Sequence, residues 1–152
     1  MVTYEKMNQT EFQEYMEFML PDYARDISEH YLIAIEKANE EAEQQMKNLL
    51  PDQEKTEGHH LYLIKKDNEN AGYLWFHIKK DEKKAFLYHI YILDSFRKQG
   101  VAKKALGFFE EEARTEDAAS LGLHVFGSNV NAIELYKRLG YEQASISMNK
   151  VL

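Results

Sequence analysis

The sequence predicts a single α+β domain, a mixed β-sheet with helices on both faces. Three strand-like segments follow one another closely at residues 61–64, 71–78 and 85–93, which is typical of an antiparallel meander. A helical segment and another apolar segment at 121–126 come next. A strand, a helix and a strand in this order imply a parallel crossover, so the fourth of these strands joins the third in parallel.

The bulk composition is that of a soluble globular domain covering residues 1–152. Hydrophobic residues make up 44% of the chain and charged residues 30%, and a chain of 17.9 kDa can bury a sizeable core. No run of 18 apolar residues and no apolar segment typical of a secretory signal are present, so we expect a cytoplasmic protein without a membrane partner. The absence of cysteine excludes disulfides, thiolate metal ligands and an acyl-cysteine intermediate.

Charge is unevenly distributed along the chain. The net charge of −7 argues against nucleic acid as the main partner. Residues 1–60 carry 14 acidic and five basic side chains, a net of −9, whereas residues 61–152 carry 12 acidic and 14 basic ones, a net of +2. The first part therefore suits a cationic partner and the second an anionic one, although a solvated pair of acidic helices also explains the first part.

The N-terminal part of the sequence predicts one strand and two helices. Residues 2–5 form the strand. Thr10 and Gln13 have the spacing of a capping box, and we expect the helix that they begin to end at Leu20, directly before Pro21.

A second helix is expected over residues 22–48, because apolar residues recur there at helical spacing. Its length leaves room for a kink or a break. A polar loop over residues 52–60 includes the adjacent pair His59 and His60, which we interpret as solvated. Residues 65–70 are expected to form the first turn of the meander.

The C-terminal part of the sequence predicts two helices and a final strand. One helix begins after Gly100, and another covers residues 129–139 and ends at Gly140. Residues 141–152 are expected to form the last strand, because Ile146 and Met148 alternate with polar residues.

The turn before the first of these helices predicts an anion site. A helix start leaves about four backbone N–H groups without a partner inside the helix, and the macrodipole makes that end partly positive. Gly100 allows a ligand to approach the backbone closely, and Arg97, Lys98, Lys103 and Lys104 add positive charge. A diphosphate suits such a site, whereas Gly100 taken alone favours an ordinary turn between strand and helix with solvated lysines.

Two stretches resemble the signatures of the GCN5-related N-acetyltransferases (GNAT). Residues 97–102, Arg-Lys-Gln-Gly-Val-Ala, fit the R/Q-x-x-G-x-G/A turn of that family. Residues 125–141 resemble its second signature, an Asn, an Ala three residues on, then Leu-Tyr and Gly-Tyr. The predicted order of elements matches that fold along nearly the whole chain.

The resemblance implies acetyl-coenzyme A as donor and an amine as acceptor. Residues 85–141 would then be the acetyl-coenzyme A-binding core, and residues 1–60 would supply the helices on the acceptor side. The backbone of the turn would hold the pyrophosphate, and the strand before it would pair with the pantetheine arm. The residues so implied are Ile90, Tyr91, Ile92, Arg97, Lys98, Gln99, Gly100, Val101, Ala102, Lys103, Asn129 and Tyr136.

The resemblance makes Tyr136 the general acid that protonates the departing thiolate. Pattern alone would make it a core tyrosine, just as Asn129 could simply cap its helix. The general base stays open, because the strand over residues 85–93 has no carboxylate. His89 and His124 are candidate bases and Tyr88 is a candidate proton relay, and for each histidine a structural role is the alternative.

We therefore expect direct acetyl transfer to the primary amine of a cationic small molecule or peptide, such as a polyamine, an amino sugar or a peptide amine. No metal is implied. The alternative is a non-catalytic acetyl-coenzyme A-binding sensor or assembly module of the same fold. A homodimer is compatible with the sequence, which leaves the oligomeric state and the identity of the acceptor open.

Overall fold

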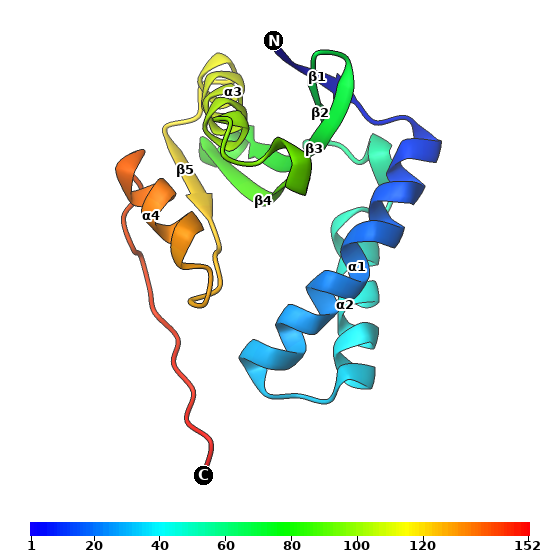
Figure 1. Ribbon diagram of the computed structural model, residues 1–152, viewed down its shortest axis with the longest axis vertical. Coiled ribbons are helices and arrows are strands. Elements are labelled where there is room, and N and C mark those ends of the chain that lie inside the picture. The colour runs from blue at the N-terminus through cyan, green and yellow to red at the C-terminus, as the bar shows by residue number, and fades with distance from the viewer.

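A computed structural model describes residues 1–152 as a five-stranded sheet with four α-helices (Figure 1). The strands lie in the order β1-β2-β3-β4-β5, and only the β4–β5 pair is parallel. The predicted meander, crossover and α+β class are confirmed. The elements are β1 (Val2–Lys6), α1 (Gln9–Tyr31), α2 (Ile35–Leu49), β2 (His59–Lys66), β3 (Glu69–Lys79), β4 (Lys84–Ile92), α3 (Val101–Thr115), β5 (Ser120–Leu123) and α4 (Val130–Arg138), with short 3-10 turns at 53–55, 80–82 and 94–96.

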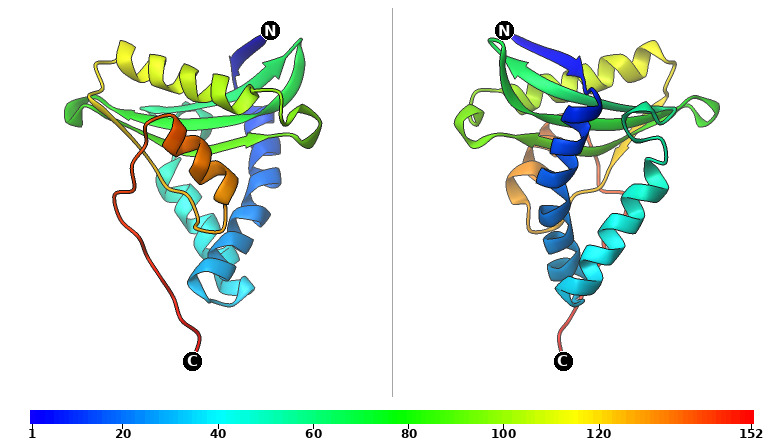
Figure 2. Two further views of the ribbon diagram at one scale, coloured as in Figure 1. Left: turned by 60° about the vertical axis from the view of Figure 1, so that its left-hand side comes forward. Right: turned by 90° about the vertical axis from the view of Figure 1, so that its right-hand side faces the viewer.

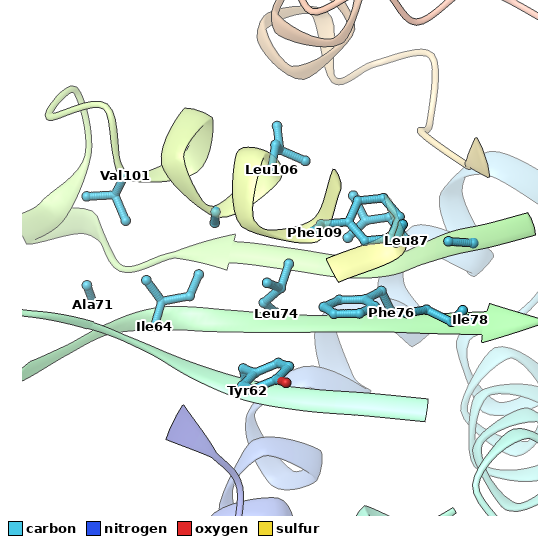
Figure 3. Close-up of a cluster of buried hydrophobic side chains, with 13 residues drawn as sticks. Tyr62, Ile64, Ala71, Leu74, Phe76, Ile78, Leu87, Val101, Leu106 and Phe109 are labelled. Carbon is cyan, nitrogen blue, oxygen red and sulfur yellow. The ribbon is translucent and has the colours of Figure 1, made fainter. Parts of the chain in front are cut away.

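Helices cover both faces of the sheet (Figure 2). Helix α3 lies along one face, where it and the sheet share a cluster of 13 buried residues that includes Phe76 and Phe109 (Figure 3). Helices α1 and α2 stand on the other face, where Tyr15 and Trp75 belong to a second cluster of nine. No helix combines the length and the apolar run that crossing a lipid bilayer requires.

Helix α1 does not begin or end where we predicted. Its cap is Asn8, whose side chain accepts from the N–H of Glu11 while the Glu11 side chain accepts from the N–H of Asn8. The capping box is thus two residues earlier than the Thr10 pair. The helix also continues through Pro21 to Tyr31, so the predicted stop at Leu20 was wrong.

Tertiary packing explains why Pro21 does not end the helix. The proline is exposed, so the carbonyl that it deprives of a hydrogen bond can face water. On the buried side, Tyr15 and Met19 before it and Ala24 and Ile27 after it all pack into core clusters. Burial of one continuous face outweighs the local preference to stop.

The break between the first two helices comes at Leu32, eleven residues after Pro21. Leu32 adopts a left-handed conformation, with φ of 57°, and ends α1. The Ser28 hydroxyl donates to the carbonyl of Ile33 at 2.7 Å and fixes the exit of the chain. Helix α2 then returns antiparallel to α1, and the two meet through small residues, among them Ala24 and Ala38.

The meander is longer than predicted. β2 already begins at His59, so His59 and His60 are half-buried strand residues and not part of a solvated loop. The turn between β2 and β3 is reduced to Asp67 and Asn68, both with positive φ. Pairing between the strands also carries the neighbouring residues 65, 66, 69 and 70 into the ladder.

The predicted last strand is absent. β5 ends at Leu123 instead of residue 126, and residues 141–152 form no strand. They run as an extended tail along and beyond the body of the protein (Figures 1 and 2). Alternation of apolar residues predicts a strand only where a neighbouring strand is present, and this tail has none within the chain.

Candidate functional site

The turn before α3 presents a row of unused backbone donors. Gly100 takes a left-handed conformation, with φ of 76°, and a Cβ at this position would have no atom within 4 Å. None of the backbone N–H groups from Lys98 to Lys103 donates a hydrogen bond within the chain. Six donors around one helix start form a concave, partly positive surface that suits an anion with several oxygens.

Basic side chains surround this turn. Lys98, Lys103 and Lys104 are exposed, and none of them takes part in an ion pair. Arg97 is held in place, because its Nε donates to the carbonyl of Ile92 at 2.9 Å and its guanidinium lies 5.2 Å from the ring centre of Tyr91. The lysines remain available to a ligand, whereas the arginine mainly orders the end of β4.

β4 and β5 separate just before this turn. They pair over only four residues each, from Lys84 opposite Ser120 to Leu87 opposite Leu123. From residue 88 to Ile92, β4 has no neighbour on that side, although β3 continues beside it on the other. The gap exposes a strand edge that can hydrogen-bond to an amide-containing ligand.

A β-bulge lies where the strands part. His89 is opposite Trp75 and Leu87 is opposite Phe76, so Tyr88 is an extra residue in β4. The bulge breaks the alternation of side chains. Tyr88 stacks on Trp75, with ring centres 4.8 Å apart, while its neighbour His89 also contacts the α1 side.

His89 is held in an environment that keeps it neutral. Its Nδ1 lies 2.6 Å from the hydroxyl of Tyr15, a fully buried residue of α1. Loss of water around the imidazole lowers the pKa of His89 to about 4, and nearby Asp22 opposes this only in part. A group with this pKa is a weak base at neutral pH, so the surroundings favour the structural alternative for His89.

Tyr136 lies on α4 with its hydroxyl unpaired. Its side chain packs against the cluster under α3, and its ring meets Tyr141 edge-on at 5.8 Å. Burial raises the pKa of the Tyr136 phenol above its ordinary value, which keeps it protonated. The residue lines a cavity of about 1250 Å³ together with Leu123 and His124. A protonated phenol without a partner, facing a cavity, can donate a proton.

Asn129 and His124 flank the opened end of β5. The side-chain oxygen of Asn129 accepts from the N–H of Ala132 at 3.3 Å and caps α4, while the residue itself stays exposed. His124 is exposed and makes only an edge-on ring contact with Phe126. The structure thus places Tyr136 and His124 around one cavity, and Tyr88 and His89 apart from it on the β4 side.

Helix α1 brings acidic groups to the same region. His30 stacks on Phe126 at 4.3 Å, and its Nε2 lies 2.7 Å from the hydroxyl of Ser128. This contact joins the end of α1 to the segment after β5. Potential metal-ligand atoms of Asp26 and Glu29 lie within 4.8 Å of those of His30, which places two carboxyl groups beside the opened strands.

Sequence reasoning missed a second group of aromatic residues. His59 accepts from the indole N–H of Trp75 at 3.0 Å and lies against His77, with ring centres 4.3 Å apart. Burial lowers the pKa of His59 to about 4. With Tyr88, His77 lines a smaller cavity of about 530 Å³ that β3, β4 and β5 border together. The His59, Trp75 and His77 positions share one face of neighbouring strands, a relation that appears only once the register is known.

Comparison with known proteins matches the acetyltransferase (GNAT) family model to residues 10–141. The "uncharacterized N-acetyltransferase YdgE" of Bacillus subtilis (strain 168) is 42% identical over 59 residues, which cover 39% of this chain and 38% of YdgE. The chain therefore matches well under half the length of this curated relative.

Solved structures extend the likeness to the whole chain. The crystal structure of YycN from Bacillus subtilis superposes with a TM-score of 0.93 at 29% identity and covers 100% of this chain and 99% of its own. AAC(6')-Iy in complex with the bisubstrate analogue CoA-S-monomethyl-acetylneamine shares the fold, with a TM-score of 0.61 at 14% identity over 100% of this chain and 98% of its own. The matched family model, which spans most of the chain, shows that this protein belongs to the GNAT acetyltransferase family.

Proposed function

We propose that this protein transfers an acetyl group from acetyl-coenzyme A to the primary amine of a cationic small molecule or peptide. The observation that carries the proposal is the row of six free backbone donors before and at the start of α3, next to an unpaired strand edge. A pyrophosphate fits the first feature and an amide-containing arm fits the second, and in coenzyme A the pyrophosphate is joined directly to such an arm.

The donor is oriented by main-chain groups in this proposal. The N–H groups of residues 98–103 hold the pyrophosphate, and Lys98, Lys103 and Lys104 neutralise its charge. The free edge of β4 from Tyr88 to Ile92 aligns the pantetheine arm. This arrangement places the acetyl end in the gap between β4 and β5.

Tyr136 supplies the proton in the proposed reaction. The amine nitrogen forms a bond to the acetyl carbon, and the carbon–sulfur bond breaks with its electron pair on sulfur. The Tyr136 hydroxyl, which burial keeps protonated, gives its proton to this thiolate. The proton that the amine loses passes to water or to His124, the exposed histidine on the same cavity.

Acidic groups on α1 support a cationic acceptor. Asp22, Asp26 and Glu29 recur at helical spacing, and contacts of His30 bring the end of this helix against Phe126 and Ser128. An amine that enters between α1 and the opened strands therefore passes carboxylates. AAC(6')-Iy, with the same fold, is an aminoglycoside N-acetyltransferase, and aminoglycosides are cationic.

An acceptor screen tests the proposal directly. Release of free thiol from acetyl-coenzyme A is followed with matched amines: a polyamine, an aminoglycoside, a lysine-containing peptide, and neutral and acidic amino acids. We expect kcat/KM to be highest for the cationic acceptors. A preference for neutral or acidic amines would contradict the acceptor class, and tight donor binding without turnover by any amine would instead favour a non-catalytic sensor.

A substitution at the turn tests the donor site. Gly100→Glu adds a charge and a side chain where the pyrophosphate is proposed to lie, and we expect it to abolish coenzyme A binding measured by calorimetry. Thr115→Glu adds the same charge at the other end of α3 and is expected to bind normally. Unchanged binding by a folded Gly100→Glu variant would mean that the phosphates bind elsewhere.

A further inference from the structure

The face of β4 that points away from α3 carries an aromatic side chain that belongs to no core cluster. Ala85 and Leu87 belong to the buried cluster beneath α3 (Figure 3), so Phe86 between them points to the opposite face of the sheet. Phe86 is half-buried, and it is neither a member of any of the three core clusters nor packed against one. A single apolar ring at a surface needs no explanation, but this one borders a cavity together with other rings.

This cavity, of about 530 Å³, is called the aromatic cleft below. β3 contributes His77 to its lining, β4 contributes Phe86 and Tyr88, and β5 contributes Gly122. Its volume lies within the usual range of small-molecule pockets, about 300–1,000 Å³. The aromatic cleft therefore has the size of a site for one small ligand or for one part of a larger one.

The rings at the aromatic cleft form one connected array. Phe86 meets Tyr88 edge-on with ring centres 4.9 Å apart, and Tyr88 stacks on Trp75 at 4.8 Å. His59 lies 5.5 Å from Tyr88 and 4.3 Å from His77, measured between ring centres. The indole N–H of Trp75 donates to His59, so this polar atom is already satisfied inside the array. What the array offers to a ligand is therefore ring faces and ring edges.

The array is uncharged near neutral pH. Burial, with His77 as a neighbour, lowers the pKa of His59 to about 4, and burial, with Lys79 as a neighbour, lowers the pKa of His77. The charged side chains of the lining stand at the far end of the cleft, where Lys79 pairs with Glu82 and Lys84 is exposed. Two lysines and one glutamate give this end a net charge of +1. A second positive charge on an acceptor is therefore better placed beside α1 than in the cleft.

Gly122 makes room for the ring of Phe86. The two residues are opposite each other in the parallel ladder of β4 and β5. A Cβ at residue 122 would lie 3.3 Å from Cδ1 of Phe86, a closer approach than side chains normally make. A larger residue would displace the Phe86 ring, so the glycine maintains the shape of the aromatic cleft.

The aromatic cleft adjoins the gap in which the acetyl group is proposed to lie. Tyr88 lines the cleft, and it is also the first residue of β4 beyond the pairing with β5. Phe86 lies two residues, about 7 Å, further back along β4. A ligand ring beside Phe86 can therefore be joined to an amine at the gap by a chain of two or three carbon atoms.

We propose that the aromatic cleft holds a planar aromatic ring of the acceptor, so that the preferred substrate is a primary amine with a ring two or three carbon atoms from its nitrogen. The inference rests on the acetyl transfer proposed above and narrows its acceptor. Rings that stack or meet edge-on gain more than the buried area alone provides, which favours a flat ring over an aliphatic group of the same size. The same chemistry occurs in a free arylalkylamine and in the N-terminal aromatic residue of a peptide.

Matched amines test the preference for a ring. 2-Phenylethylamine and 2-cyclohexylethylamine have the same number of non-hydrogen atoms, and only the first has a flat ring. We expect kcat/KM to be about two- to tenfold higher for 2-phenylethylamine, the effect of one aromatic pair on a rate. Peptides that begin with phenylalanine or with cyclohexylalanine form a second pair, and the pair with the higher kcat/KM shows whether the acceptor is a peptide or a free amine. Equal values within both pairs would overturn the proposal.

Substitutions assign the preference to the aromatic cleft. Phe86→Leu keeps an apolar side chain but removes the ring, and it should bring the ratio of kcat/KM for the two ethylamines close to one. Phe108→Leu makes the same change at a half-buried residue of α3 that stacks on Tyr4, and it should keep the wild-type ratio. If Phe86→Leu does not fold, Gly122→Val should lower kcat/KM for 2-phenylethylamine more than for ethylamine. A wild-type ratio in folded Phe86→Leu, or equal losses in Gly122→Val, would overturn the assignment.

Fluorescence of Trp75, the only tryptophan, reports on the aromatic cleft without any turnover. Because Tyr88 stacks on Trp75, a ring bound in the cleft should change the emission saturably, and 2-phenylethylamine should do so at a lower concentration than 2-cyclohexylethylamine. Such binding without thiol release by any amine would refute acetyl transfer and leave the cleft as a binding site. Turnover without a preference for the aromatic amine would refute the role of the cleft and leave acetyl transfer standing. Neither binding nor turnover would refute both.

Discussion

Burial keeps both Tyr136 and His89 uncharged near neutral pH, although it moves their pKa values in opposite directions. Loss of water raises the pKa of the Tyr136 phenol and lowers the pKa of His89 to about 4. The phenol therefore retains a proton that it can give, whereas the imidazole has little affinity for one. At the scale of single residues, the structure supports an acid on α4 more strongly than a base on β4.

Replacing Tyr136 by Phe removes the hydroxyl and keeps the ring packed. We expect kcat to fall by about 10²–10⁴-fold, the usual contribution of positioned proton transfer, with little change in the Kd for acetyl-coenzyme A. Steady-state kinetics and calorimetry measure the two quantities. Tyr141→Phe is the matched control, since its ring contacts Tyr136, and it should change kcat only slightly. Equal rates for wild type and Tyr136→Phe would exclude the phenol from the reaction.

The pH dependence of the free energy of unfolding should reveal the protonation of His89. Its pKa is lowered in the folded chain to about 4 from an ordinary value of 6.5, so the unfolded chain binds more protons between these values. Stability is therefore fully present above pH 6.5 and is lost as the pH falls towards 4, at up to about 1.4 kcal/mol per pH unit. Protonation also leaves Nδ1 able only to donate to the Tyr15 hydroxyl.

Urea unfolding at several pH values measures this loss. His89→Gln should be less stable than the wild type at pH 7.5 but should show a shallower decline towards pH 4.5. His124→Gln, at an exposed histidine with no hydrogen bond in the chain, should keep the wild-type slope. Parallel slopes for the wild type and His89→Gln would show that another group carries the acid sensitivity.

Among the elements, α1 makes the clearest case of tertiary packing that overrides local preference. A proline inside a helix removes one hydrogen bond and costs about 3 kcal/mol. Helix α1 remains continuous despite this cost because its buried face continues on both sides of Pro21. The continuous helix carries Asp26, Glu29 and His30 to the opened strands, which a helix ending at residue 20 would not do.

Pro21→Ala should therefore stabilise the protein. The restored hydrogen bond and relieved clash outweigh the greater entropy of the unfolded chain, and we expect a gain of about 1–2 kcal/mol in urea unfolding. Pro51→Ala, at the only other proline, lies outside the helices and should have no stabilising effect. A loss of stability in Pro21→Ala would mean that the proline relieves a strain elsewhere in α1.

The sequence allowed correct prediction of the elements that depend on patterns of neighbouring residues. The meander and the crossover followed from runs of apolar residues, and the free donors at Gly100 followed from the helix start. The β4 bulge at Tyr88, the tail without a strand and the passage of α1 through Pro21 depend on neighbours that are distant in sequence. The environment of His89 is of the same kind, since Tyr15 is 74 residues away.

At the scale of the whole molecule, negative charge gathers where the acceptor is proposed to bind and positive charge where the donor is proposed to bind. The acidic surplus lies in residues 1–60, which form α1 and α2, and free lysines surround the turn at Gly100. The two substrates would therefore meet opposite potentials. The fields of exposed groups are screened by salt, with a Debye length of about 8 Å at physiological ionic strength.

Salt should therefore weaken the binding of a cationic acceptor more than it slows the acetyl transfer itself. Raising sodium chloride from 50 to 500 mM should increase KM for a polyamine several-fold, because screening reduces attraction by the α1 carboxylates. The KM for an uncharged amine of similar size should change little, which controls for general effects of salt. Equal changes for both acceptors would show that the acidic surplus does not attract the substrate.

Because β4 and β5 are joined only by a short ladder, a small rotation at that ladder changes the width of the gap between them. Four residue pairs fasten β5 to the sheet at one end, and the unpaired part of β4 extends about 16 Å from there. A rotation of about 5° at the ladder would move the open end by about 1.4 Å, half the length of a hydrogen bond. The contact of His30 with Ser128 ties that open end to α1. A change in the position of α1 would therefore be passed on, through one side chain, to the segment that borders the gap.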